Sequence, residues 1–88
     1  MIIGVDVGTT VTKAAVFDRD GRAVTEADKP TTLHRTGGAR VEQDLDEVLA
    51  TVSSVVRKVA ATQSQPVTAL ALTGQGDGLW LRGADGRP

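Results

Sequence analysis

A short glycine- and threonine-containing segment near the amino terminus has residue types that bind phosphate. Gly8 lets the backbone approach a ligand closely, and successive backbone N–H groups in such a turn can form an anion-binding nest. The hydroxyls of Thr9 and Thr10 add hydrogen-bond donors, and Lys13 adds a positive charge nearby. Asp6 could hold Mg²⁺ through its water shell, since this ion binds few carboxylates and keeps several waters. The pattern predicts a site for phosphate groups and their metal ion.

A plain hairpin turn, in which the same residues serve only the backbone, is the alternative interpretation of this D-x-G-T-T string. The string is not a Walker loop, because G-x-x-x-x-G-K-[ST] does not occur in the chain. It is not a Rossmann fingerprint either, because the glycine turn leads into a second β-branched run and not into a helix. A strand–turn–strand unit must therefore position these residues.

Three strands are expected around this turn. The β-branched runs at 2–7 and 11–17 predict two strands joined by a turn at 8–10. A turn signal at 18–21 then leads to a loosely alternating segment at 22–29, which predicts a third strand. Two successive hairpins are the topology that this order favours.

A polar loop and an amphipathic helix follow. Residues 31–38 contain glycine and few apolar side chains, so they predict a loop in which His34 is exposed and has no partner. The clearest helix is expected over 44–62, where Asp44 and Glu47 have the spacing of a capping box. Its apolar residues recur at helical spacing and predict one buried stripe, which consists of Leu45, Val48, Leu49, Val52, Val55, Val56 and Val59.

The last third of the chain predicts a strand, a loop and a hairpin. Residues 67–73 have the apolar run of a strand that returns beside the first one, and the glycine-rich segment 74–78 predicts a loop. Residues 79–81 are expected to form a short fifth strand before the turn at 83–86. Trp80 is expected to pack this strand against a neighbouring layer, because a lone aromatic residue usually serves packing. The fold class is α/β.

Composition excludes several classes of protein. The 88 residues allow one small domain, and a formal net charge of −1 without a basic stripe argues against a nucleic-acid partner. The absence of cysteine excludes a disulfide scaffold. No signal peptide and no apolar run of membrane-spanning length occurs, so a cytoplasmic protein without a membrane partner is expected. The helix stripe and the sheet would expose apolar surface that only further layers could cover, which predicts an N-terminal fragment.

Four segments carry a resemblance to a known family. Residues 3–18 resemble the first phosphate motif of the actin, Hsp70 and sugar kinase superfamily. The V-E-Q-D step at 41–44, the strand and loop at 69–81 and the turn at 85–88 are similar to the FGGY carbohydrate kinases, such as xylulokinase and glycerol kinase. The resemblance covers nearly the whole chain, and it implies the ribonuclease H-like fold of the actin-like ATPases.

The same resemblance implies roles for individual residues. It implies that Asp6 lies near the transferred phosphate and its Mg²⁺. It implies that the turn contacts the phosphates of ATP through Gly8, Thr9 and Thr10. Lys13 stands where glycerol kinase has an Arg that approaches the phosphates, so the same role is implied for it. It also implies that the sugar or polyol touches Gln75, Gly76 and Asp77. Glycerol kinase has Arg-Glu and xylulokinases commonly have Met-His at the last two positions, so neither acceptor is implied. A flexible loop with a solvated Asp77 is the alternative.

The catalytic apparatus of such a kinase would be incomplete in this chain. The resemblance places the general-base Asp, the second phosphate motif and the adenosine pocket beyond residue 88, so no catalytic residue is assigned here and the 88 residues alone are expected to be inactive. Residues 1–88 would be the N-terminal portion of the first kinase domain, with the rest of that domain and the C-terminal lobe as its missing partners. A homodimer of the full-length protein stays open. Two other hypotheses remain: a non-catalytic truncated or binding module, and an ATPase activator of the same superfamily.

Overall fold

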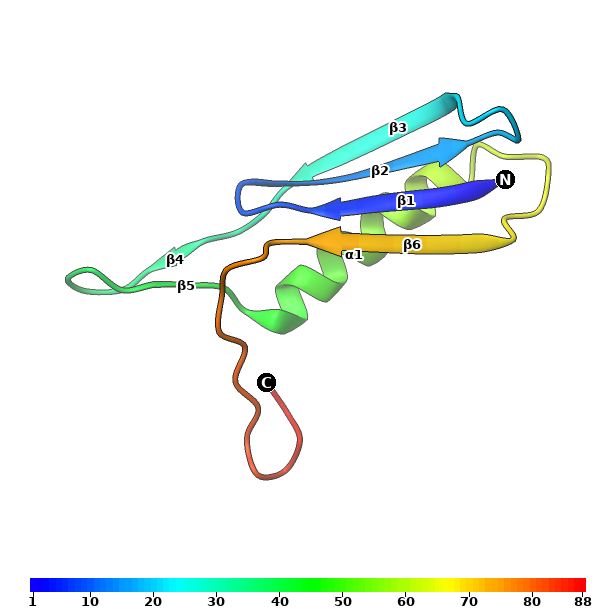
Figure 1. The fold of residues 1–88 in the computed structure, drawn as a ribbon. Coiled ribbons are helices and arrows are strands. Elements are labelled where there is room, and N and C mark those ends of the chain that lie inside the picture. The colour runs from blue at the N-terminus through cyan, green and yellow to red at the C-terminus, as the bar shows by residue number, and fades with distance from the viewer.

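The chain forms seven regular elements, six strands and one helix. The computed structural model describes all residues from 1 to 88. The elements, in chain order, are β1 (Ile2–Val7), β2 (Val11–Phe17), β3 (Ala23–Pro30), β4 (His34–Arg35), β5 (Val41–Glu42), α1 (Leu45–Ala60) and β6 (Ala69–Gly74). Figure 1 shows one main sheet with the helix behind it and a narrow hairpin, β4 and β5, that projects to one side.

The main sheet has four strands in the order β3-β2-β1-β6. β1, β2 and β3 are joined by two hairpins and pair antiparallel, whereas β6 pairs parallel to β1 after the crossover through α1. This arrangement confirms the two predicted hairpins and the predicted return of the later strand beside the first. Parallel pairing brings the carboxyl ends of β1 and β6 to the same edge, with Val7 opposite Gly74.

The core lies between the sheet and α1. Alternate residues of the central strands face the helix and are buried, and the cluster consists of Ile3, Val5, Ala14, Val16, Ala27, Val55 and Val59. The predicted helical stripe is therefore correct for Val55 and Val59, but Leu45 and Leu49 are 36% and 63% exposed. These leucines lie in the first turns of α1, beyond the surface that the sheet covers.

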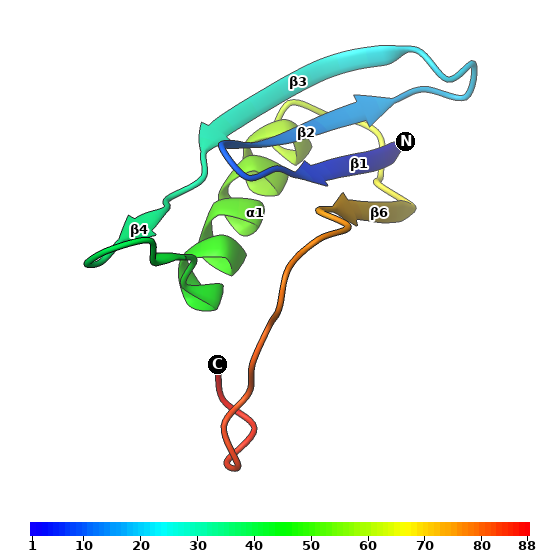
Figure 2. The same ribbon diagram turned by 60° about the vertical axis from the view of Figure 1, so that its left-hand side comes forward.

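One strand of the sheet has no helix over it. α1 contacts β1, β2 and β3, but it makes no contact with β6. Leu70 and Leu72, which pair with the buried Ile3 and Val5 and so lie on the helix side of the sheet, are 47% and 61% exposed. Figure 2 shows β6 at the edge of the sheet, set apart from α1. The expected apolar surface is present within the 88 residues.

Two predicted segments differ from the structure. The loop expected over 31–38 contains β4, which pairs with β5 across a turn where Gly37 and Gly38 have φ of 60° and 63°. Strands of two residues carry no detectable alternation, so the pattern could not reveal them. The fifth strand expected over 79–81 is not formed, because the segment runs away from the sheet and no strand lies alongside it (Figure 2).

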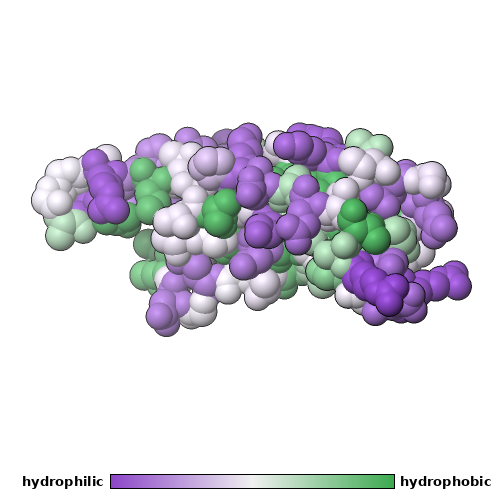
Figure 3. Space-filling model, turned by 90° about the horizontal axis from the view of Figure 1, so that it is seen from above, coloured by the Kyte–Doolittle hydropathy of each residue, from purple (hydrophilic) through white to green (hydrophobic).

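The turns predicted at 18–21 and 83–86 are both formed. Asp18 accepts hydrogen bonds from the backbone of Asp20 and Arg22, each at 2.9 Å, and Gly86 N donates to Gly83 O at 2.9 Å. Seen from the β3 side, hydrophilic and hydrophobic residues are mixed without one large apolar area (Figure 3). α1 lacks the length and the apolar character of a bilayer-spanning helix.

Candidate functional site

The turn between β1 and β2 is held too tightly for any residue larger than glycine at position 8. Gly8 N donates to Val11 O at 3.0 Å, which closes the turn. A Cβ built on Gly8 would lie 2.4 Å from that carbonyl oxygen, well inside the contact distance of real Cβ atoms. Glycine is therefore required here by close backbone approach. The adjoining Thr9 and Thr10 are exposed, so their hydroxyls are accessible to a ligand.

Two buried threonines support this turn from behind. Thr31 Oγ1 donates to Gly8 O at 3.0 Å, and Thr31 N donates to Thr10 O at 2.9 Å. The same hydroxyl lies 3.1 Å from Thr12 Oγ1, and both side chains are buried. Sequence reasoning missed Thr31, because the contact joins residues that are distant in the chain. The only available signal was the pairing of the third strand, which places its end beside the turn.

Asp6 and Lys13 stand opposite each other on the sheet face that α1 leaves open. The pairing of the four strands aligns Thr73, Asp6, Lys13 and Asp28 in one row across the sheet. Asp6 follows the buried Val5, and strand alternation points it away from the helix. Its carboxylate forms no ion pair in this row and is exposed.

The residues around the turn suit a Mg²⁺ ion that phosphate groups also coordinate. They do not form a complete metal site by themselves. No group of three or more His, Cys, Asp or Glu side chains is placed to hold a metal ion. Mg²⁺ is commonly bound through one or two carboxylates plus substrate phosphates and waters. A single exposed carboxylate such as Asp6, at the edge that carries the Gly8 turn, has that character.

A hollow of about 560 Å³ joins the turn to the glycine-rich loop that follows β6. Thr9 lines it from the β1–β2 turn, and Gln75 and Asp77 line it from the loop. The structure therefore brings together one residue of the predicted phosphate site and two of the predicted acceptor residues. Gly76 lies outside the lining, but its surroundings are open, with no atom within 4 Å of a built Cβ.

Trp80 lines the same hollow and is 50% exposed. This position corrects the expectation that it packs a strand against a neighbouring layer, because no such strand forms. The other predicted residues, Asp6, Gly8, Thr10 and Lys13, do not line the hollow. They lie around the adjoining end of β1 and the start of β2, so the hollow opens beside them.

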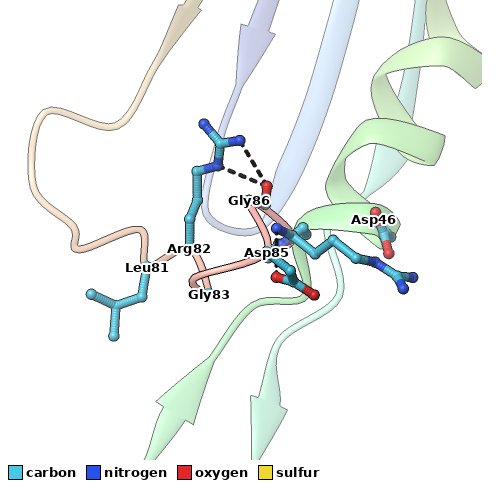
Figure 4. A pocket seen from close by; sticks show the side chains of 8 residues that line it. Asp46, Leu81, Arg82, Gly83, Asp85 and Gly86 are labelled. Carbon is cyan, nitrogen blue, oxygen red and sulfur yellow. Dashed lines mark hydrogen bonds between the residues drawn. The ribbon is translucent and has the colours of Figure 1, made fainter.

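A larger hollow of about 810 Å³ lies at the turn near the carboxyl terminus and has a different character. In Figure 4, Arg82 Nε and Nη2 both donate to Gly86 O, at 2.9 and 2.7 Å, and brace this turn. Only one of its eight lining residues is hydrophobic, and none comes from the Gly8 turn or from the loop at 75–78. Ligand sites are mostly apolar with a few converging polar groups, so the smaller hollow is the better candidate.

The start of α1 forms the opposite wall of the smaller hollow and is firmly capped. Asp44 Oδ1 accepts hydrogen bonds from Asp46 N at 2.8 Å and Glu47 N at 3.1 Å, which confirms the predicted N-cap. Glu47 does not complete a capping box, because its side chain instead bonds His34 Nε2 at 2.7 Å. His34 therefore has a partner, contrary to expectation, and this bond ties the β4–β5 hairpin to α1.

We expect this bond to raise the pKa of His34 above its ordinary value of 6.5, mainly through the hydrogen bond to Glu47 and then through that residue's negative charge. A raised folded-state pKa means that the pairing stabilises the fold fully below pH 6.5 and stops doing so as pH rises through the folded-state pKa. The check is an NMR titration of His34, assigned by comparison with His34→Gln. Glu47→Gln should return the pKa toward 6.5, and a wild-type pKa at or below 6.5 contradicts the assignment.

The four-stranded sheet, the crossover helix and the parallel return of β6 together define an α/β domain of the ribonuclease H-like type. Residues 1–88 match the FGGY family of carbohydrate kinases, N-terminal domain. The chain belongs to this family.

Individual relatives agree with this membership. An erythritol kinase from Brucella abortus (strain 2308) is 38% identical over 100% of this chain and 18% of its own length. The crystal structure of a xyloylose kinase from Brucella ovis superposes with a TM-score of 0.86 at 25% identity, covering 97% of this chain and 18% of that one. The crystal structure of a gluconate kinase from Lactobacillus acidophilus superposes with a TM-score of 0.80 at 30% identity, covering 84% of this chain and 15% of that one. The chain thus spans less than a fifth of the length of these relatives.

Proposed function

We propose that residues 1–88 form the phosphate-binding and acceptor-binding edge of an ATP-dependent sugar or polyol kinase, as the N-terminal portion of its first domain. The observation that carries this proposal is the single hollow lined by Thr9 of the Gly8 turn and by Gln75 and Asp77 of the loop after β6. Phosphoryl transfer depends mainly on positioning and on charge neutralisation. A hollow that joins a phosphate turn to hydrogen-bonding groups provides the positioning.

In the proposed reaction, the acceptor hydroxyl oxygen forms a bond to the γ-phosphorus of ATP while the bond from that phosphorus to the bridging oxygen breaks and ADP leaves. The backbone and hydroxyls of Gly8, Thr9 and Thr10 orient the phosphates, and Lys13 offsets their charge. Asp77 accepts hydrogen bonds from acceptor hydroxyls, and Gln75 can donate and accept. Asp6 would hold Mg²⁺, which supplies charge neutralisation when bound. The proton of the attacking hydroxyl passes to a carboxylate that we place outside residues 1–88.

The kinase hypothesis is favoured over the two alternatives by separate observations. Family membership supports a kinase against an ATPase activator. The exposed Leu70 and Leu72 on β6 and the exposed Leu49 on α1 support further layers of the same longer chain. We refer below to that longer polypeptide as the parent kinase, and we propose that its remaining part covers this surface and supplies the second lobe.

The test is ADP formation by the parent kinase over a panel of polyols and pentoses. We expect turnover with a small polyol, the class to which erythritol belongs, and we expect Asp77→Ala to raise the KM for that acceptor at least about 10-fold, because a charged hydrogen-bond partner contributes about 1.5–3 kcal/mol. The KM for ATP should change less than about twofold.

Asp85→Ala is the matched control, since this carboxylate only accepts from Arg87 N within the last turn and does not line the smaller hollow. It should leave both KM values unchanged. ATP hydrolysis that no acceptor on the panel stimulates would contradict the kinase and favour the activator.

A further inference from the structure

The charges around the smaller hollow are all of one sign. Four acidic residues line it, and no lysine, arginine or histidine does. Three of the acids belong to the wall formed by β5 and the start of α1, namely Glu42, Asp44 and Asp46, and the fourth is Asp77 on the facing loop. A negatively charged acceptor placed between these walls meets repulsion from both sides.

The start of α1 does not offset this repulsion. A free helix N-terminus attracts anions through its unpaired N–H groups. Here the carboxylate of Asp44 already accepts from the N–H groups of Asp46 and Glu47. An incoming carboxylate or phosphate would have to displace Asp44 to use them.

One uncharged polar side chain of this wall is free to bind. Asp44 is used by the helix cap, and Glu42 Oε1 lies 3.8 Å from Arg40 Nε in an exposed ion pair. Gln43, between them, lines the hollow, is only partly exposed and makes no side-chain hydrogen bond within the chain. A carboxamide can donate and accept, which matches the two roles of a hydroxyl group.

We infer that the acceptor of this kinase is an uncharged polyol, held between Asp77 on one wall and Gln43 on the other, and that acceptors bearing a carboxylate or a phosphate are rejected. This inference rests on the proposed function and narrows it. Gln43 acts as a specificity-determining contact, and the acidic rim excludes sugar acids. Leu33, Leu45 and Leu79 add apolar lining to the same hollow.

The first arm of the test needs no substitution. The parent kinase is assayed with erythritol and with erythronate, which have the same carbon chain and differ in the terminal carboxylate, and then with ribitol and ribonate. We expect kcat/KM to be at least about 10-fold lower for each acid than for its polyol, because the carboxylate of the acid meets like charges on both walls of the hollow. Equal turnover of acid and polyol overturns the inference while leaving the kinase itself established. No turnover of any acceptor overturns both.

The second arm tests Gln43. Gln43→Ala should lower kcat/KM for the preferred polyol by about 3- to 10-fold, the usual net value of one neutral hydrogen bond, and should leave the KM for ATP unchanged. Gln63→Ala is the matched control, because Gln63 lies beyond the other end of α1 and its side chain bonds only Thr62. Circular dichroism confirms that both variants are folded, and calorimetric titration with the polyol measures binding apart from turnover. Equal kinetics and equal polyol affinity for the two variants remove Gln43 from the site.

Discussion

Gly8→Ala should weaken ATP binding to the parent kinase by about 100-fold, because the new Cβ cannot be accommodated without opening the turn. That atom would lie 2.4 Å from Val11 O, and the contact is with backbone that cannot rotate away. Opening the turn breaks the bond from Gly8 N to Val11 O and displaces the N–H groups that we assign to the phosphates. Two charge-assisted hydrogen bonds, each of about 1.5–3 kcal/mol, account for a loss of this size.

Calorimetric titration with ATP measures the effect. Gly74→Ala is the control, since Gly74 ends the neighbouring strand at the same edge and its Cβ would lie at an ordinary 3.7 Å from Val7 O. A thermal melt of each variant separates lost binding from lost folding. Unchanged ATP affinity in folded Gly8→Ala would falsify the assignment of this turn to phosphate.

Asp6→Asn should lower kcat of the parent kinase by about 100-fold or more, because removing a metal-held charge at the transferred phosphate removes electrostatic stabilisation of the transition state. The substitution keeps the size of the side chain and its place in the row with Lys13. The Mg²⁺ concentration needed for half-maximal rate should rise at the same time, so the assay is repeated over a metal titration.

Asp28→Asn removes the same charge from the same row, on the other side of Lys13. It should change kcat by less than about twofold, because Asp28 lies on β3, and β2 with Lys13 separates it from the end of β1. Equal effects of Asp6→Asn and Asp28→Asn on kcat would mean that the two carboxylates act only through their combined negative charge beside Lys13. Asp6 would then have no particular link to the metal ion.

The parts of the site that were predicted from sequence are those with a local physical cause. Gly8 marks a turn because only glycine tolerates the close carbonyl, and Asp44 marks a helix start because its side chain reaches N–H groups two and three residues ahead. The parts that were missed depend on contacts over longer separations. Thr31 supports the turn from 23 residues away, and His34 bonds a glutamate 13 residues away.

The fifth strand expected at 79–81 was predicted from a local pattern but is not formed, because a strand also needs a distant partner. Its apolar residues have strand character, but a strand exists only when a neighbour supplies the other half of its hydrogen bonds. Within these 88 residues, Leu79 and Leu81 are 83% and 73% exposed and the segment extends away from β6. Local propensity alone could not decide between the two outcomes.

The sequence by itself determined the four strands of the main sheet and the helix, the tight glycine turn and the helix cap, because each depends on side chains within a few residues of one another. Only the tertiary structure decided which residues share a site. Pairing β6 parallel to β1 carries Gln75 and Asp77 to the edge that holds Thr9, and the crossover helix places Gln43 and a row of carboxylates on the facing wall. Neighbours of this kind are set by strand register and helix packing over the whole chain, so no local pattern encodes them.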